Sequence, residues 1–332
     1  MFKSDGCAMK LIIPGGSGHL GSILKRAFEA DEHKVVVISR RGPATLDEVD
    51  GADVVINLAG RSVNCRYTKR NREEIMRSRV DSTRAVGEAI ARAVRPPRVW
   101  LQASTATIYE HTYGPPNDEN GTLGGNEPGV PETWRFSIDV ARAWERAFDE
   151  AKTPLTRKIA LRSAIVMSPD PGGPFDLLLN LVRYGLGGRA GDGRQYVSWI
   201  HYRDFVSAIR WLIANESLSG IFNIAAPHPL PNAEFMEAVR KAWGIGFGLP
   251  STRWMLEMGA WLMRSETELI LKSRRVVPAR LLASGFTFEF PTWPEAARDL
   301  CAQRRNHDRS KLSRLPGNQP RRYRMGRKHA SS

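Results

Sequence analysis

The chain has 332 residues, 42% of them hydrophobic and 25% charged, which is typical of a globular protein with one large domain or two. Its 3 cysteines, Cys7, Cys65 and Cys301, are too scattered to predict a disulfide framework or a metal site. No apolar run approaches the ~20 residues needed to span a bilayer, and the first residues lack the apolar segment of a secretory signal. The sequence therefore predicts a cytoplasmic protein without a membrane span.

The formal net charge of +14 is concentrated at the C-terminus. Residues 302–332 hold ten lysines and arginines but a single acid, Asp308, so they account for +9 of the +14. Their scarcity of apolar residues predicts a basic, disordered tail over residues 301–332. We interpret this tail as a solvated extension, with contact to RNA, DNA or an acidic membrane surface as the alternative.

In chain order, the first predicted elements lie in and after residues 10–21, KLIIPGGSGHLG. The apolar start predicts a buried parallel strand that stops at glycines, and the following SILKRAFEADEH predicts a helix. A strand, a glycine turn and a helix in this order are typical of a dinucleotide-binding loop. Glycines let the backbone approach a pyrophosphate, and the helix N-terminus offers free N–H groups. An ordinary glycine-rich turn is the alternative.

The second predicted strand, residues 34–39, ends at Arg40 and Arg41. In NAD-binding units an acidic residue about 20 positions after the glycine turn binds the ribose 2′-hydroxyl. Arg40 stands 19 positions after Gly21, where that acid is expected. A guanidinium suits a 2′-phosphate instead, so the sequence favours NADP(H) over NAD(H). Alternatively, the two arginines only solvate the strand end.

Strands and helices continue to alternate up to residue 168. Strands are predicted at residues 52–58, 99–104 and 158–166, and helices at residues 68–93 and 132–151, with a long loop at 109–131. This alternation predicts an α/β fold of Rossmann type, with a doubly wound parallel sheet over residues 1–168.

The pattern changes after residue 168, where PDPGGP reads as a linker. We expect a strand at 220–225 and helices at 177–184, 204–215, 232–243, 251–264 and 268–282, with Asn232 as an N-cap. Residues 169–300 are therefore predicted to form a smaller, α-rich C-terminal lobe that encloses a substrate against the strand edges.

Several motifs in order resemble the extended short-chain dehydrogenase/reductase superfamily. They are PGGSGHLG, NLAG at 57–60, RYT at 66–68 followed by SRVDSTR, then SWIH and APHPLPNAEF. The nearer resemblance is to its NAD-dependent epimerase/dehydratase-like branch, which carries a C-terminal domain of unknown function, here residues 246–300. One departure is Pro14, where the family usually has threonine.

The resemblance assigns two groups of cofactor-binding residues. The turn supplies a cradle for the pyrophosphate, and the NLAG segment borders the adenosine and ribose side. The residues implied are Gly15, Ser17, Gly18, His19, Leu20 and Gly21, then Asn57, Leu58, Ala59 and Gly60.

The catalytic pattern of the superfamily is incomplete in this chain. Ser104 fits the expected serine at a strand end, but no tyrosine has lysine four residues later. The positions of that pair fall at Ser137 and Ala141. The close branch has a tyrosine just beyond the strand, which here is Tyr109. The resemblance implies that Tyr109 transfers a proton beside Ser104, with Glu110 or His111 assisting; in the alternative, Tyr109 only packs at the loop and the site is degenerate.

His201 and Asp204 invite a catalytic interpretation, but we expect them to fix a loop and cap a helix. The sequence therefore predicts an NADP(H)-binding oxidoreductase or epimerase-like enzyme with an unknown small-molecule substrate. A cofactor-binding protein without turnover, acting as a redox sensor or partner-binding module, is the alternative. Nucleic-acid binding through the tail is a third hypothesis.

Overall fold

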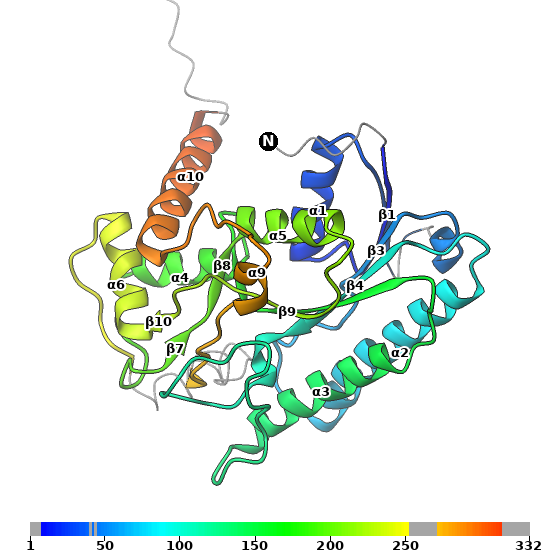
Figure 1. Cartoon of the computed structure of the whole chain (residues 1–332). Coiled ribbons are helices and arrows are strands. Elements are labelled where there is room, and N and C mark those ends of the chain that lie inside the picture. The colour runs from blue at the N-terminus through cyan, green and yellow to red at the C-terminus, as the bar shows by residue number, and fades with distance from the viewer. Residues whose placement is uncertain (1–7, 40–41, 43–44, 252–270, 314–332) are drawn as a thin grey trace, which may run out of the picture.

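A parallel sheet forms the centre of the molecule in this computed structural model, which describes residues 8–39, 42, 45–251 and 271–313 (Figure 1). The sheet has six strands in the order β2-β1-β3-β4-β5-β9, and every neighbouring pair is parallel. The strands are β1 Lys10–Pro14, β2 Lys34–Ile38, β3 Val54–Asn57, β4 Val99–Thr105, β5 Arg157–Ser163 and β9 Gly220–Ile224. The predicted Rossmann-type doubly wound sheet is confirmed.

Helices cover both faces of the sheet because its strands are apolar on both sides. In β1, Leu11 and Ile13 point into the core with α1 and α5, whereas Ile12 points into the core with α2 and α3. The bounds of these helices are α1 His19–Ala30, α5 Tyr202–Ala214, α2 Lys69–Arg92 and α3 Glu132–Asp149. Two short 3-10 helices, η1 Leu46–Val49 and η2 Ala106–Ile108, lie in the connections.

A second group of elements lies beside the sheet (Figure 1). Its core contains Phe235 and Trp293, whose rings stack 4.0 Å apart, and the neighbouring Trp199. Two small two-stranded sheets pair β6 with β8 and β7 with β10. The elements are β6 Ile165–Met167, α4 Pro174–Arg183, β7 Tyr196–Val197, β8 Trp199–His201, β10 Leu230–Pro231, α6 Asn232–Trp243 and α10 Trp293–Ser313. The short helix α9 Ala279–Ala283 packs instead against β9, and its Leu281 lies in the core of the main sheet.

Three boundaries differ from the sequence-based prediction. The predicted strand at 158–166 is two strands, because the chain changes its pairing partner at Ala164. The N–H of Ala164 donates to the carbonyl of Ile224, whereas the N–H of Ile165 donates to the carbonyl of Ser198. β9 is a strand of the main sheet and α5 packs on that sheet, so the chain does not divide cleanly at residue 168. Helix α10 runs to Ser313, well into the segment predicted as a tail.

The predicted helix at 268–282 is confirmed only in part. Leu271 and the residues of α9 from Ala279 onward are helical, but residues 272–278 between them are not, and Val276 is bridged to Asn117. The predicted helix at 251–264 lies almost entirely outside the described residues. No helix in the described ranges is long and apolar enough to cross a membrane.

Candidate functional site

The glycine turn between β1 and α1 has no room for side chains at two positions. Gly15 has φ +76°, and a Cβ there would lie 2.6 Å from the Cα of Ala59. A Cβ at Gly21 would lie 2.3 Å from the Cα of Gly16. The N-cap of α1 is Gly18, which has no side chain to bond the first amides of the helix. The turn and the helix N-terminus therefore form a bare backbone surface suited to an anion.

The NLAG segment follows β3 and lies against this turn. Leu58 donates its N–H to the carbonyl of Pro14 at 2.8 Å, which joins the two strand ends. Asn57 is fully buried, accepts from the N–H of Ala59 at 3.1 Å and donates to Gln102 at 2.9 Å. Asn57 thus shapes the turn of its own segment.

A cavity of about 550 Å³ begins at the glycine turn and extends along the ends of β3 and β4 to α3. Many of the residues expected to bind cofactor line it: Gly15, Gly18, His19, Leu20, Gly21, Leu58 and Gly60. Ser17, Asn57 and Ala59 are not among its lining residues. Arg40 and Arg41, on which the NADP(H) prediction rests, lie outside the described residues.

Ser104, at the end of β4, lines the same cavity and is 7% exposed. Its Oγ donates a 2.5 Å hydrogen bond to Glu145 of α3. Glu145 also pairs with Arg162 through bonds of 2.8 and 2.7 Å. Burial lowers the pKa of Arg162, but hydrogen bonds to Glu145 and its charge outweigh that effect and raise it above its usual value. Because a hydroxyl has one proton, Ser104 offers the cavity its lone pairs.

Tyr109 lies apart from the cavity, 1% exposed in a small core cluster. Its hydroxyl donates to Asn223 at 2.8 Å and accepts from Arg162 at 3.0 Å. Burial raises the pKa of Tyr109, although Arg162 opposes this. The geometry therefore does not support proton transfer by Tyr109 and agrees with the packing alternative. Of its two suggested assistants, His111 borders a separate hollow and Glu110 lines neither cavity.

Ser137 and Ala141, which occupy the positions of the superfamily's tyrosine and lysine, both line the cavity. The lining residues that sequence reasoning missed include Tyr67, Arg79 and Arg274. Tyr67 lies inside the RYT motif, which was the available signal. Among the described residues that line this cavity there are arginines but no aspartate or glutamate. Its charge therefore favours an anionic ligand.

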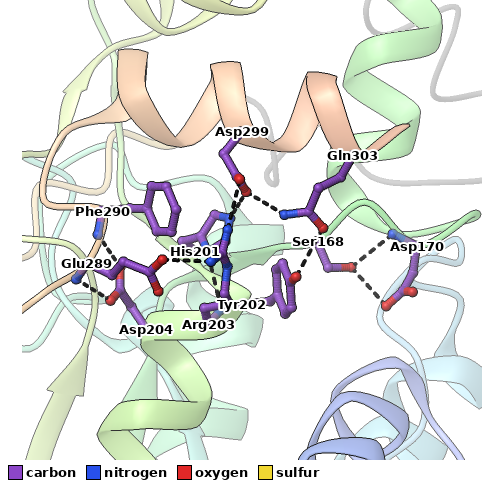
Figure 2. Close-up of polar contacts among 10 residues, drawn as sticks. All are labelled: Ser168, Asp170, His201, Tyr202, Arg203, Asp204, Glu289, Phe290, Asp299 and Gln303. Atoms are coloured by element: carbon purple, nitrogen blue, oxygen red, sulfur yellow. Dashed lines mark hydrogen bonds and ion pairs between the residues drawn. The ribbon is translucent and has the colours of Figure 1, made fainter. Parts of the chain in front are cut away.

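His201 and Asp204 belong to a polar cluster (Figure 2), and neither residue lines the cavity. His201 is the N-cap of α5: Nδ1 accepts from the N–H of Arg203, so Nε2 carries the proton and donates to Asp299 of α10 at 3.0 Å. Asp204 accepts from the N–H groups of Glu289 and Phe290 at 2.7 and 2.9 Å. Their structural role is confirmed, although His201 rather than Asp204 caps the helix.

Burial shifts the pKa values of His201 and Asp204. It lowers the pKa of His201 to about 4, although Asp299 opposes the shift, and it raises the pKa of Asp204 to about 6.

The N-cap prediction for Asn232 is wrong: Pro231 precedes α6 as its cap, and the Asn232 side chain accepts from the N–H of Ala190 at 2.7 Å.

Comparisons with known proteins agree with this architecture. The sequence model of the NAD dependent epimerase/dehydratase family matches residues 11–225, and that of a domain of unknown function, DUF1731, matches residues 252–300. The chain belongs to the NAD-dependent epimerase/dehydratase family. Within it, the chain carries the additional DUF1731 region at its C-terminal end.

Relatives match over nearly their whole length. The bovine (Bos taurus) epimerase family protein SDR39U1 is 30% identical over 308 residues, covering 89% of this chain and 100% of that protein. Epimerase family protein YfhF of Bacillus subtilis is 27% identical over 314 residues, covering 90% and 99%. The crystal structure of human SDR39U1 with NADPH superposes with a TM-score of 0.80 at 28% identity, covering 89% of this chain and 99% of that one.

A UDP-N-acetylglucosamine 4-epimerase from Bacillus cereus shares the fold at 15% identity and a TM-score of 0.69, covering 90% of this chain and 100% of that one.

Proposed function

We propose that this chain binds NADP(H) in the cavity at the carboxyl edge of the sheet and acts as an oxidoreductase or epimerase-like enzyme. The observation that carries the proposal is the continuous cavity from the bare glycine turn to Ser104. Ligands of open α/β sheets bind at this edge. The substrate then lies beyond Ser104, toward the side where the C-terminal elements begin.

The residues present fit such a cofactor. The backbone at Gly15 and Gly21 is close-packed, so the turn can approach a pyrophosphate without side chains intervening. The acid-free lining, with Arg79 among its members, suits the phosphates. Arg40 at the position of the usual ribose-binding acid, and NADPH in the structure of the human relative, support the phosphorylated cofactor.

Ser104 has a defined part in this proposal. The bound cofactor supplies hydride transfer chemistry, as nicotinamides do. With its proton donated to Glu145, Ser104 accepts a hydrogen bond from a substrate hydroxyl and orients the carbon that bears it. A carbonyl substrate would need its hydrogen-bond donor from another residue.

Calorimetric titration with NADPH and, separately, NADH tests the proposal. We expect tighter binding of NADPH, and we expect Arg40→Asp to weaken it at least about tenfold, equal to 1.4 kcal/mol, with little effect on NADH. Arg84→Asp, a charge reversal on the exposed side of α2, serves as the control. Failure to bind either nucleotide would overturn the proposal.

Cofactor binding without turnover is the second candidate. The observation that favours it is the cavity-facing pair Ser137 and Ala141, where the superfamily pattern has tyrosine and lysine. A panel of aldehydes and ketones, followed by NADPH absorbance, separates the two. Turnover that falls in Ser104→Ala while NADPH affinity is retained supports the enzyme; NADPH binding without turnover supports the second candidate.

A further inference from the structure

The phenol of Tyr67 lies beside Ser137, the position at which the superfamily pattern has a tyrosine and this chain does not. Tyr67 lies in the connection between β3 and α2, directly before the N-cap Thr68. Its hydroxyl lies 3.3 Å from Oγ of Ser137, the residue at the position of the superfamily's α3 tyrosine. Both residues line the cavity. A tyrosine from one element thus reaches the position that a tyrosine on another element would occupy.

Packing holds the Tyr67 ring in this position. The ring meets Phe136 edge-on at 5.1 Å and forms a small cluster with Ile75 and Val140. Its backbone carbonyl accepts from Nε of Arg72 at 3.0 Å. Tyr67 is only 9% exposed. A largely buried side chain with its hydroxyl at a cavity wall has the preorganisation that proton transfer requires.

A buried cation accompanies the phenol. Arg79, on α2, lines the cavity, donates to the carbonyl of Ile75 at 3.1 Å and lies 5.1 Å from the Trp144 ring. Burial lowers the pKa of Arg79 to about 10, and its electrostatic interaction with Tyr67 opposes that shift. The interaction is mutual, so the guanidinium also favours the ionised form of the phenol. Lysine plays the equivalent role beside the tyrosine of the superfamily pattern.

We propose that Tyr67 is the proton donor and acceptor of this site, with Arg79 as the cation that assists it. The inference rests on the proposed function. In the reducing direction the substrate carbonyl carbon gains two electrons and a hydrogen from the nicotinamide, and the Tyr67 O–H bond breaks to protonate the oxygen. The phenolate then takes a proton from solvent; oxidation runs the steps in reverse. Ser104 accepts from the hydroxyl so formed, because its own proton is donated to Glu145.

Ultraviolet titration of tyrosinate tests the proposal without a known substrate. In the wild type we expect the Tyr67 phenol to ionise at a lower pH than it does once the charge of Arg79 is removed, because a nearby cation favours the ionised form. That component should vanish in Tyr67→Phe and remain in Tyr184→Phe, which removes an exposed phenol from the end of α4. Arg79→Met should move it upward, and Arg79→Lys should restore it. A Tyr67 component at the same pH in the wild type and in Arg79→Met would overturn the role of Arg79.

Two further measurements separate this proposal from the proposed function. NADPH titration of Tyr67→Phe should match the wild type, since the variant keeps the ring that packs on Phe136. Absence of NADPH binding in the wild type would contradict cofactor binding, whereas the tyrosinate titration would still report on Tyr67. With any carbonyl compound that the wild type reduces, Tyr67→Phe should lower kcat about 100-fold or more. Unchanged kcat would overturn the assignment.

Discussion

The buried pair of Glu145 and Arg162 determines how Ser104 is presented to the cavity. The side chains of the pair are 11% and 4% exposed, so neither charge can be solvated if its partner is removed. Glu145→Ala should therefore lower the free energy of unfolding by about 3–5 kcal/mol, which urea denaturation would measure. The control is Glu132→Ala, which removes an exposed ion pair: the Glu132 side chain is 78% exposed and pairs with Arg72. This variant should lower the free energy of unfolding by less than about 1 kcal/mol. Equal losses in the two variants would show that the buried pair has no special role.

Gly21 is a position where the usual preference for alanine in helices is reversed. Alanine normally stabilises a helix by about 1 kcal/mol over glycine, but here its Cβ would lie 2.3 Å from the Gly16 backbone. We expect Gly21→Ala to cost about 1–3 kcal/mol and to weaken NADPH binding at least about tenfold. Gly246→Ala, whose Cβ would meet nothing within 4 Å, is the matched control and should leave both unchanged. Normal NADPH affinity in Gly21→Ala would contradict the role of the turn.

The role of a single residue was predictable only where the neighbouring sequence contains the elements that position it. Ser104 follows from its place at a strand end and lines the cavity as expected. The role of Tyr109 was not readable, because its hydroxyl partners Asn223 and Arg162 meet through adjacent strands far along the chain. Tyr67 was missed for a similar reason: its neighbour Ser137 is 70 residues away.

At the scale of elements, a polar cluster fastens α10 to the start of α5 (Figure 2). His201 and Arg203 both bind Asp299 of α10, and Arg203 also pairs with Glu289 in the segment before it. Tyr202 donates to Gln303 at 3.0 Å. The C-terminal helix is therefore held by groups whose charge depends on pH.

His201 and Asp204 should change stability with pH in opposite directions. His201 has a folded-state pKa of about 4 against the usual 6.5 of an exposed histidine, so its contribution favours folding above pH ~6.5 and is lost as pH falls toward 4. Asp204 has a folded-state pKa of about 6 against 3.8, so its contribution is present at low pH and is lost as pH rises toward 6. Each full effect is on the order of 3 kcal/mol, at ~1.4 kcal/mol per unit.

Urea unfolding of His201→Asn and Asp204→Asn from pH 4 to 7 measures this opposition. Asparagine retains a cap for α5 at residue 201. Relative to the wild type, His201→Asn should lose stability as pH rises, and Asp204→Asn should gain it. Parallel pH profiles for the wild type and both variants would contradict the account.

Helices and strands were predictable where the periodicity was long and bounded by capping or turn residues, as in α2 and α3. The break between β5 and β6 could not be predicted in this way, because it arises where the chain stops pairing with β9 and begins pairing with β8. Asn232 looked like a cap in sequence, but its side chain is used by the N–H of Ala190. Long-range hydrogen bonds decide these cases, and local patterns do not contain them.

For the whole molecule, the alternation of strands and helices was sufficient to predict the parallel sheet and the edge at which the cavity lies. It was not sufficient to predict that the chain returns from the C-terminal elements to add β9 as the sixth strand. As a result, the second half of the chain stabilises the sheet as well as bordering the cavity: Phe205 of α5 and Ile165 of β6 both line it.

Hydrogen–deuterium exchange with and without NADPH tests the central claim, that the cavity along the glycine turn holds the cofactor. The account predicts slower exchange at residues 15–21 and 58–63 and at the end of β4, because each of these segments contributes residues to the lining of that cavity. Exchange around the separate hollow at Tyr113 and Trp134 should change less. Protection confined to that hollow, or no protection anywhere, would contradict the assignment of the site.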